Sequence, residues 1–552
     1  MSALADPYEA RRAKRAAGLL REFNEIGVLS AADVHVAARL AELAGEESEP
    51  VKLAVALAVR GPRLGNVFVD LATIRDTASV ESDEPVDLSG LPWPDTEEWT
   101  RALGGSELVA RGEDAGSKPV RLLGTRLYLD RYWRDERAVA ADLNEMTASG
   151  RLQVIAGGPG TGKTTRVARM VAELVAQAGD RPPLIALAAP TGKAAARLQE
   201  AVYEQVTAGG LRAATLHRLL GWRPRSHSRF AHDRGNRLPH DVVIVDETSM
   251  VSLSLMARLV ESVRPDARLV LVGDPGQLAS IEAGVVLADI VAAGRGVEVL
   301  QRVHRFGEGI AKLADAIRAG DGDAAVAALG AAPNEITWLA TDVHETGAGL
   351  ELVRDQAVTA GLEVAGAARA GAALKALAAL GRFRLLCAHR RGPYGVSDWT
   401  SRVQGWLAPD IEDIEQRDYV GRPLLVTEND YELGLYNGDT GVIVEGSGGR
   451  PSAAFERGGE VLPFSPLRLG SVETVYAMTI HKSQGSQFDT AAVLLPGAGS
   501  RILTRELLYT AVTRARQELI LVGAEATVRD AIARPVARAS GLAGRLSGGA
   551  SG

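Results

Sequence analysis

The chain has 552 residues, of which 46% are hydrophobic and 24% charged, so its composition is that of folded domains and excludes a disordered protein. Its length predicts several domains, and its net charge of -7 argues against a surface that binds nucleic acid everywhere, although DNA contacts confined to one groove are compatible with it. A single cysteine, Cys387, excludes an internal disulfide; with no signal peptide at the N-terminus and no apolar run of about 18 residues, a cytoplasmic protein without membrane spans is expected.

Residues 1–105 are expected to form a mostly helical N-terminal domain. Apolar residues recur at helical spacing over residues 16–28 and 34–43, and residues 66–71 are predicted to form a strand. The region carries no phosphate-binding, metal-binding or catalytic pattern, and the acidic, Gly- and Pro-containing stretch 82–116 after it is typical of a linker. A domain this small buries little surface alone, so it is expected to pack on a partner protein or on the rest of the chain.

From residue 152 onward, apolar runs of strand length alternate with helical patterns, which predicts parallel sheets buried on both faces. The runs of the first series are 152–156, 184–189, 242–245, 269–272 and 297–300; those of the second are 385–388, 424–427, 474–478, 491–495 and 519–522. Residues 437–472 are rich in Gly, Pro and short β-prone runs and predict a small β insertion. An α/β chain is therefore expected, with a first sheet domain at 106–307 and a second at 308–552.

A glycine-rich loop between the first strand of this region and a helix fits the P-loop pattern. Its residues are Gly157, Gly158, Pro159, Gly160, Thr161, Gly162, Lys163, Thr164 and Thr165. In such a loop the backbone amides surround phosphate oxygens, and the helix N-terminus adds a partial positive charge. Lys163 is expected to reach the β and γ phosphates and the Thr164 hydroxyl to bind Mg²⁺, so ATP and Mg²⁺ are the predicted cofactors.

Acidic and basic residues elsewhere complete a predicted hydrolysis site. Asp246 and Glu247 end the strand at 242–245, where Asp246 would lie near the magnesium and Glu247 would activate the attacking water. Gln277 follows another apolar strand and is a candidate sensor of the γ-phosphate. Arg305 and Arg514 are candidates to stabilise the charge of the departing phosphate; each of these residues also has an ordinary structural interpretation when taken alone.

Together these segments resemble the ordered motifs of superfamily-one helicases, which contain two RecA-like domains. Residues 189–193 are similar to motif Ia, 215–217 to motif Ib, 476–485 to motif V and 509–516 to motif VI. Within that superfamily the chain resembles the RecD family of helicase–nuclease subunits. The stretches that carry this likeness are 385–396, 435–441 and 534–546.

The resemblance implies an ATP-dependent motor that moves 5′ to 3′ on single-stranded DNA in double-strand break repair. It implies a heterotrimer with RecB- and RecC-like subunits that takes the 5′ strand at a duplex end, a nuclease site on a partner, an SH3-like insertion, and docking of the N-terminal domain on the RecC-like subunit. Hydroxyls and cationic side chains suit phosphate contacts that ignore base sequence, although each could instead cap a helix or pack in the interior. The residues so placed in the single-strand groove are Thr191, Lys193, Thr215, His217, Thr479, His481 and Lys482.

One departure from the family pattern concerns the nucleotide base. The glutamine that reads adenine in such helicases is missing, because only a short segment separates Glu145 from Leu152. Gln153 lies within the predicted strand, and residues 131–137 are an alternative contact. An arginine-rich loop at 223–240 is either solvated or a binding segment. Two other functions stay open: a free-standing helicase of the same family, which would carry a longer N-terminal region, and an assembly subunit with a vestigial ATPase.

Overall fold

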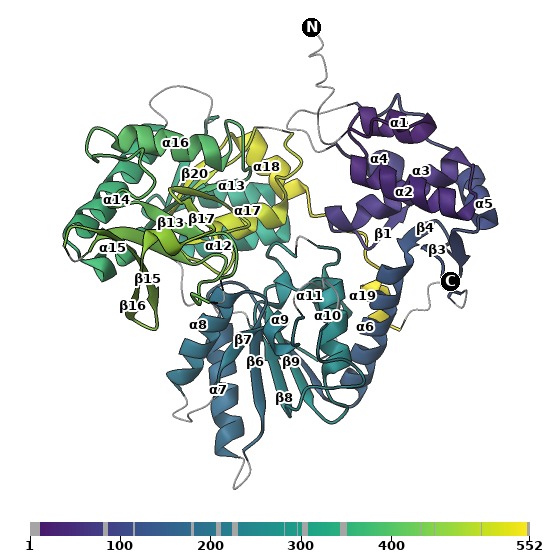
Figure 1. Ribbon diagram of the computed structural model, residues 1–552, viewed down its shortest axis with the longest axis horizontal. Helices are drawn as coiled ribbons and strands as arrows, with labels where there is room; N and C mark the ends of the chain where they lie inside the picture. Colours follow the sequence, from purple (N-terminus) through teal and green to yellow (C-terminus); the bar gives the residue numbers. More distant parts are fainter. Residues whose placement is uncertain are drawn as a thin grey trace.

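The structure is a computed structural model, and it describes residues 12–548 apart from 81–86, 114–115, 178–181, 206–210, 224–229, 281, 295, 301–306, 343–349, 431, 447 and 498. Figure 1 shows three bodies: N-terminal helices in purple, a first sheet in teal and a second sheet region in green and yellow. Among the described residues, no helix combines the length and apolar character that crossing a membrane requires.

The N-terminal body consists of helices packed on a four-stranded sheet of order β1-β4-β3-β2. Its elements are α1 (Gly18–Glu25), α2 (Ala31–Ala44), α3 (Glu49–Arg60), η1 (Gly61–Leu64), β1 (Phe68–Asp70), α4 (Ile74–Thr77), α5 (Thr96–Gly105), β2 (Val109–Arg111), β3 (Val120–Leu123) and β4 (Arg126–Leu129). One cluster of buried side chains runs from Ala13 to Leu127, and α3 lies at its centre with Leu53 to Leu57 fully covered. The stretch expected to be a linker was therefore wrongly interpreted, since it contains α5 and β2.

The first parallel sheet has the order β10-β5-β9-β8-β6-β7. Its elements are α6 (Asp130–Ala148), β5 (Leu152–Gly157), α7 (Lys163–Ala176), β6 (Ile185–Ala189), α8 (Gly192–Tyr203), β7 (Ala213–Thr215), α9 (Leu216–Leu219), β8 (Val242–Val245), η2 (Thr248–Met250), α10 (Leu253–Ser262), β9 (Arg268–Gly273), α11 (Val286–Ala293) and β10 (Val297–Leu300). The central strands β5, β8 and β9 are buried on both faces, as their continuous apolar runs predict. The predicted parallel sheet is confirmed.

The second parallel sheet has the order β11-β20-β19-β12-β18. Its elements are α12 (Glu308–Ala319), α13 (Gly322–Ala331), β11 (Ile336–Leu339), α14 (Glu351–Arg369), α15 (Ala373–Leu380), β12 (Phe383–Cys387), α16 (Val396–Leu407), β18 (Ala477–Thr479), β19 (Phe488–Leu494), α17 (Arg505–Val512), β20 (Ala515–Val522) and α18 (Glu525–Ala533). The last helix, α19 (Leu542–Leu546), leaves this body and packs beside α6 and α11 of the first (Figure 1).

An antiparallel sheet of order β16-β15-β14-β13-β17 is inserted in the second body. Its strands are β13 (Pro423–Val426), β14 (Thr440–Glu445), β15 (Pro451–Arg457), β16 (Glu460–Phe464) and β17 (Val472–Thr474), and η4 (Pro466–Arg468) precedes the last. The run at 424–427 was predicted to belong to the parallel sheet, and that prediction was wrong. Leu424 and Val426 pack in the core of the insertion, whereas Leu425 packs in that of the parallel sheet, so β13 has the continuous apolar run of a strand buried on both faces.

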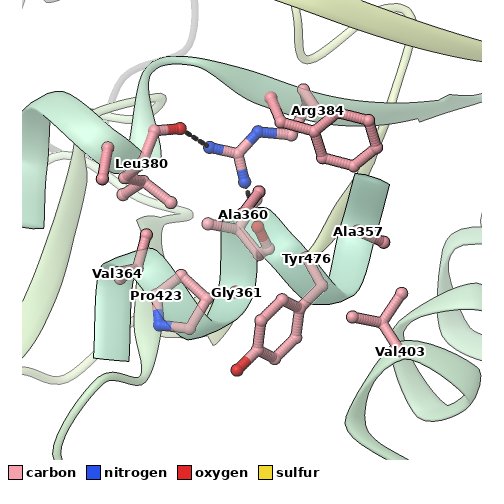
Figure 2. Close-up of a pocket in the computed structure, with 12 residues that line it drawn as sticks. Ala357, Ala360, Gly361, Val364, Leu380, Arg384, Val403, Pro423 and Tyr476 are labelled. Atoms are coloured by element: carbon pink, nitrogen blue, oxygen red, sulfur yellow. Dashed lines mark hydrogen bonds between the residues drawn. The ribbon is translucent and has the colours of Figure 1, made fainter. Parts of the chain in front are cut away.

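A buried arginine ties the insertion boundary to the second parallel sheet. The guanidinium of Arg384, on β12, donates hydrogen bonds to the carbonyl oxygens of Val475 and of Leu380, the latter at 3.0 Å. Figure 2 shows it in a small cavity beside α14, Pro423 and Tyr476. Burial lowers the pKa of Arg384 to about 10. These bonds fix the backbone that leads into β18 and the predicted motif V.

Candidate nucleotide and DNA site

The predicted P-loop connects the end of β5 to the start of α7. Gly160 and Gly162 have φ of 79° and 80°, which side chains rarely adopt. A Cβ at Gly157 would lie 2.6 Å from Thr161 Oγ1, so glycine is also required where the loop begins. Lys163 Nζ donates to the carbonyl oxygens of Gly157 and Gly158, at 2.7 and 2.8 Å. An ammonium group held inside a loop at a helix N-terminus provides the charge that phosphates require.

Thr164 and the acidic residues after β8 lie together at the end of the loop. Thr164 Oγ1 donates to Asp246 Oδ2 at 3.4 Å, and the backbone N–H of Glu247 donates to Asp246 Oδ1 at 2.8 Å. Burial, and then the charge of Glu247, raise the pKa of Asp246 to about 6. One hydroxyl and one buried carboxylate fit Mg²⁺, which takes one or two carboxylates, substrate phosphates and water.

Glu247 has a left-handed backbone, with φ of 52°, which is uncommon for a residue with a Cβ. Such conformations persist where the surrounding structure enforces them, often at functional sites. Here the hydrogen bond from its N–H to Asp246 holds the turn. The turn therefore places the two carboxylates at the edge of the sheet where β5 also ends.

The loop after β9 connects this edge to the second body. Asp274, which is buried, accepts hydrogen bonds from Gln277 Nε2 at 3.1 Å and from the hydroxyl of Tyr509 at 3.2 Å. The N–H of Leu278 donates to Thr510 Oγ1 at 3.0 Å. Gln277 is therefore next to this junction, with its amide bound to Asp274, and its role as a phosphate sensor stays a prediction. Sequence reasoning named neither Asp274 nor Tyr509 as functional, although both stand inside the motifs it used.

Arg514 lies at the same cleft, immediately after α17. It is 3% exposed, and its guanidinium donates to the carbonyl oxygens of Thr510 at 2.9 Å and Ser486 at 3.0 Å. Burial lowers the pKa of Arg514, whereas the negative charges of Glu247 and Asp274 oppose that shift, so this cation lies within electrostatic reach of the first body's acids. Arg305, the other predicted arginine, lies outside the described residues.

A cavity of about 430 Å³ lies between the loop and the second body. Gly158, Pro159 and Thr161 line one side, while α12 and Tyr509 of α17 line the other. Its volume is within the range of small-molecule sites. Gln153 does not line it, because its amide bonds Glu298 at 3.2 Å and Arg268 at 2.6 Å inside the sheet.

The arginines of α6 do not line the cavity beside the P-loop. Arg134 and Arg137 line a separate cavity with Arg121 and Trp133, and Arg131 pairs with Asp135 at 3.9 Å, so a base contact from residues 131–137 stays a prediction. Residues 224–229 of the arginine-rich loop lie outside the described residues, while Arg234 pairs with Asp142 of α6 at 2.7 Å.

The predicted DNA-contacting threonines each cap a helix or turn. Thr191 Oγ1 accepts from Ala194 N, Thr215 Oγ1 from Arg218 N and Thr479 Oγ1 from Lys482 N, each at 3.2 Å. Lys482 pairs with Glu473 of β17 at 3.1 Å. His217 packs on Phe230, and burial lowers the pKa of both His217 and His481.

Lys193 joins the two bodies. Its Nζ donates to Ser486 Oγ at 2.8 Å, and Arg197 on the same helix donates to the carbonyl oxygen of Gly485. A Cβ at Gly192 would lie 2.4 Å from the ring of Tyr436, so glycine lets the β insertion approach α8 closely. The helix α8, which begins within the predicted motif Ia, therefore contacts both the segment at the end of motif V and the β insertion, which the sequence did not reveal.

Comparison with known families matches three parts of the chain. The AAA domain family matches residues 139–339, the UvrD-like helicase C-terminal domain family matches 474–522, and the N-terminal domain of the RecBCD enzyme subunit RecD matches 25–128. Among solved structures, the Pif1 helicase from Candida albicans is similar with a TM-score of 0.40 and 14% identity, covering 71% of this chain and 95% of that one.

The similarity to individual relatives extends over nearly the whole chain. The RecBCD enzyme subunit RecD of Mycolicibacterium smegmatis is 51% identical over 573 residues, covering 96% of this chain and 99% of the relative. The RecBCD enzyme subunit RecD of Mycobacterium tuberculosis is 49% identical over 581 residues, covering 97% and 98%. At this identity and coverage, the chain belongs to the RecD family of RecBCD enzyme subunits.

Proposed function

We propose that this chain is the ATP-driven motor subunit of a RecBCD-type helicase–nuclease, translocating 5′ to 3′ along single-stranded DNA. The observation that carries the proposal is the cavity between the P-loop of one sheet body and Tyr509 of the other. Asp246 lies beside Thr164 at the end of that loop, and Arg514 of the second body lies within electrostatic reach of Glu247. Hydrolysis in such a cleft changes the contacts between the bodies. If both bodies bind the same DNA strand, movement of one body relative to the other would advance the protein along that DNA.

Each residue of the cleft has a chemical task in this proposal. Lys163 and the P-loop amides hold the phosphates. Thr164 and Asp246 would hold Mg²⁺, which would supply charge neutralisation at the phosphates. Glu247 orients and deprotonates the attacking water. Arg514 stabilises the charge that develops in the transition state, and Arg305 remains a prediction for the same task.

The DNA path proposed here crosses motifs Ia, Ib and V. Thr191, Lys193 and Thr215 would contact phosphates from the first body, and Thr479, His481 and Lys482 from the second. The partners are RecB- and RecC-like subunits acting on a duplex end in the cytoplasm, and the nuclease site is assigned to a partner. Family membership and the match of residues 25–128 favour this subunit over a free-standing helicase.

The test measures movement of the purified full-length chain, alone and with its partner subunits. We expect ATP-dependent displacement of streptavidin from the 3′ end of a biotinylated oligonucleotide and none from the 5′ end. Lys163→Gln should lower DNA-stimulated ATP hydrolysis about 100-fold or more and abolish displacement, while single-strand binding persists.

Two results would contradict the proposal. Preferential release from the 5′ end would reverse the direction. ATP hydrolysis by the wild-type chain that does not exceed that of Lys163→Gln, even in the assembled complex, would identify an assembly subunit with a vestigial ATPase.

A further inference from the structure

The C-terminal end of α12 brings an arginine to the cavity beside the P-loop. Arg318 and Asp315 line this cavity opposite Gly158 and Pro159. No sequence motif singles out Arg318, since it lies in the Ala-rich helical region between the two series of strands. It nevertheless belongs to the second body, which also contributes Tyr509 and Arg514 to the cleft.

The side chain of Arg318 passes over the loop that carries Asp274. A Cβ at Gly276 would lie 3.7 Å from Arg318 Cδ and 3.4 Å from Tyr509 Cε1, so both side chains cover the same turn. The positive charge of Arg318 also opposes the rise in the pKa of Tyr509 that burial and Asp274 cause. Arg318 therefore lies close to Tyr509 and to the turn that follows β9, at the cavity beside the P-loop.

The partner of Arg318 can be exchanged at low cost. Its Nη2 lies 2.8 Å from Asp315 Oδ1, but the two side chains are 54% and 63% exposed. Exposed ion pairs contribute little to stability, because water screens both charges. A phosphate in the cavity would offer more charge and more acceptor oxygens than this carboxylate. Arg514, by contrast, is buried and committed to backbone carbonyl groups.

We propose that Arg318 binds the terminal phosphate of the nucleotide held by the P-loop. It would act as a second guanidinium from the second body, after Arg514, and would exchange its ion pair with Asp315 for the phosphate. This inference rests on the proposed function for the identity of the ligand. It makes Arg318 a sensor that distinguishes a nucleoside triphosphate from a diphosphate. Closure of α12 on the P-loop then depends on the presence of that phosphate.

The experiment compares Arg318→Ala, Arg318→Lys and a matched control, Lys312→Ala, in the full-length chain. Lys312 lies on the same helix with a side chain that is 74% exposed, pairs with Glu308 at 3.7 Å and does not line the cavity. Fluorescent mant-AMP-PNP and mant-ADP report affinities for the triphosphate and diphosphate forms. DNA-stimulated ATP hydrolysis and the Tm of each variant are measured beside them.

We expect Arg318→Ala to weaken mant-AMP-PNP binding about ten-fold while mant-ADP binding stays within three-fold, the loss expected for one charge-assisted hydrogen bond. The kcat should fall by at least a similar factor, Arg318→Lys should give intermediate values, and Lys312→Ala should match the wild type. If Arg318→Ala leaves the ratio of the two affinities unchanged, whether both stay the same or both fall equally, the proposal is overturned. A fall in Tm of Arg318→Ala that Arg318→Lys shares would also overturn it, because packing would then explain the effect.

These outcomes are separable from failure of the proposed function. A wild-type chain that binds both nucleotides but hydrolyses none contradicts the motor, while the affinity ratio still decides the role of Arg318. A wild-type motor with normal hydrolysis and an Arg318→Ala variant indistinguishable from it contradicts only the sensor.

Discussion

Arg514 is held in place by hydrogen bonds to its own body. Its guanidinium donates to three carbonyl groups of its own body and lies within electrostatic reach of Glu247 and Asp274 in the other. A preorganised cation of this kind stabilises developing charge without the cost of ordering it during the reaction. Its contribution should therefore appear in the transition state more than in nucleotide affinity.

Arg514→Ala is expected to lower kcat about 100-fold or more and to change nucleotide affinity only a few-fold. Steady-state ATP hydrolysis with single-stranded DNA gives kcat, and mant-AMP-PNP titration gives affinity. Arg514→Lys controls for loss of the buried charge, and the Tm of both variants controls for folding. A large loss of affinity with an unchanged kcat would make Arg514 an ordinary binding residue.

Lys193 is predicted to change its charge when DNA binds. Burial, and then the positive charge of Arg197, lower the pKa of Lys193 to about 7, while Asp439 opposes that shift. Its neutral amine can donate to Ser486, whereas a contact with a DNA phosphate requires the ammonium form. If DNA takes this ammonium, binding raises the pKa of Lys193, so affinity is complete below pH 7 and declines as pH rises above 7.

Single-strand affinity should therefore fall about ten-fold or more between pH 7 and pH 9 in the wild type, one pKa unit being worth about ten-fold. Anisotropy of a labelled oligonucleotide measures it. Lys193→Arg keeps its charge throughout this range and should lose most of that slope. Identical slopes in both proteins would show that Lys193 bonds Ser486 and does not take up a proton on DNA binding.

Whether a contact of the site could be predicted from the sequence depended on how close its residues lie to a recognisable local pattern. The loop Gly157–Thr164 lies between a strand and a helix, and Thr164 meets Asp246 because parallel strands end at one edge; both follow from local pattern. The contacts Lys193–Ser486, Asp274–Tyr509 and Gly192–Tyr436 join segments more than two hundred residues apart. No periodicity indicates such pairs.

At the scale of elements, the C-terminal segment connects the bodies. After α18 the chain passes the N-terminal body, where Val67 N donates to the carbonyl oxygen of Ala539 at 2.7 Å. It then reaches α6, where Gly541 N donates to the buried Glu136 at 2.8 Å. Leu542 and Leu546 of α19 enter the core beside α6 and α11. The sequence showed a family-like ending but could not place it, because a helix this short has too few apolar positions to indicate its partner.

Leu542→Ala should destabilise the first body by about 2–5 kcal/mol, the cost of a buried cavity. The measurement is the first thermal unfolding transition, followed by circular dichroism, which should shift down by several degrees. Ser547→Ala, at an exposed position after the same helix, should leave that transition unchanged. An unchanged transition in Leu542→Ala would mean that α19 is not docked on α6.

At the scale of the whole molecule, the N-terminal body has two faces. Val67, Phe68 and Tyr128 belong to the core of the first sheet. One face of the N-terminal body therefore packs on the rest of the chain, which was one of the two expectations from the sequence. Because its cluster of buried residues continues to Leu127, a cut at residue 105 would separate β2 to β4 from their helices. We place the end of this body near residue 129.

The N-terminal body also carries exposed apolar side chains on α2. Val36 and Leu43 are 43% and 68% exposed and seven residues apart, which places them on one side of the helix. If this side docks on a RecC-like subunit, the double substitution Val36→Asp and Leu43→Asp should prevent co-purification with that subunit. It should leave the Tm and the DNA-stimulated ATPase of the isolated chain unchanged, because neither side chain supports the core.

Leu374→Asp, an equally drastic change at a side chain that is 49% exposed on α15, is the matched control and should assemble normally. Normal assembly of the double variant would defeat docking through α2, and a joint loss of Tm and ATPase would show that this side of α2 supports the motor itself.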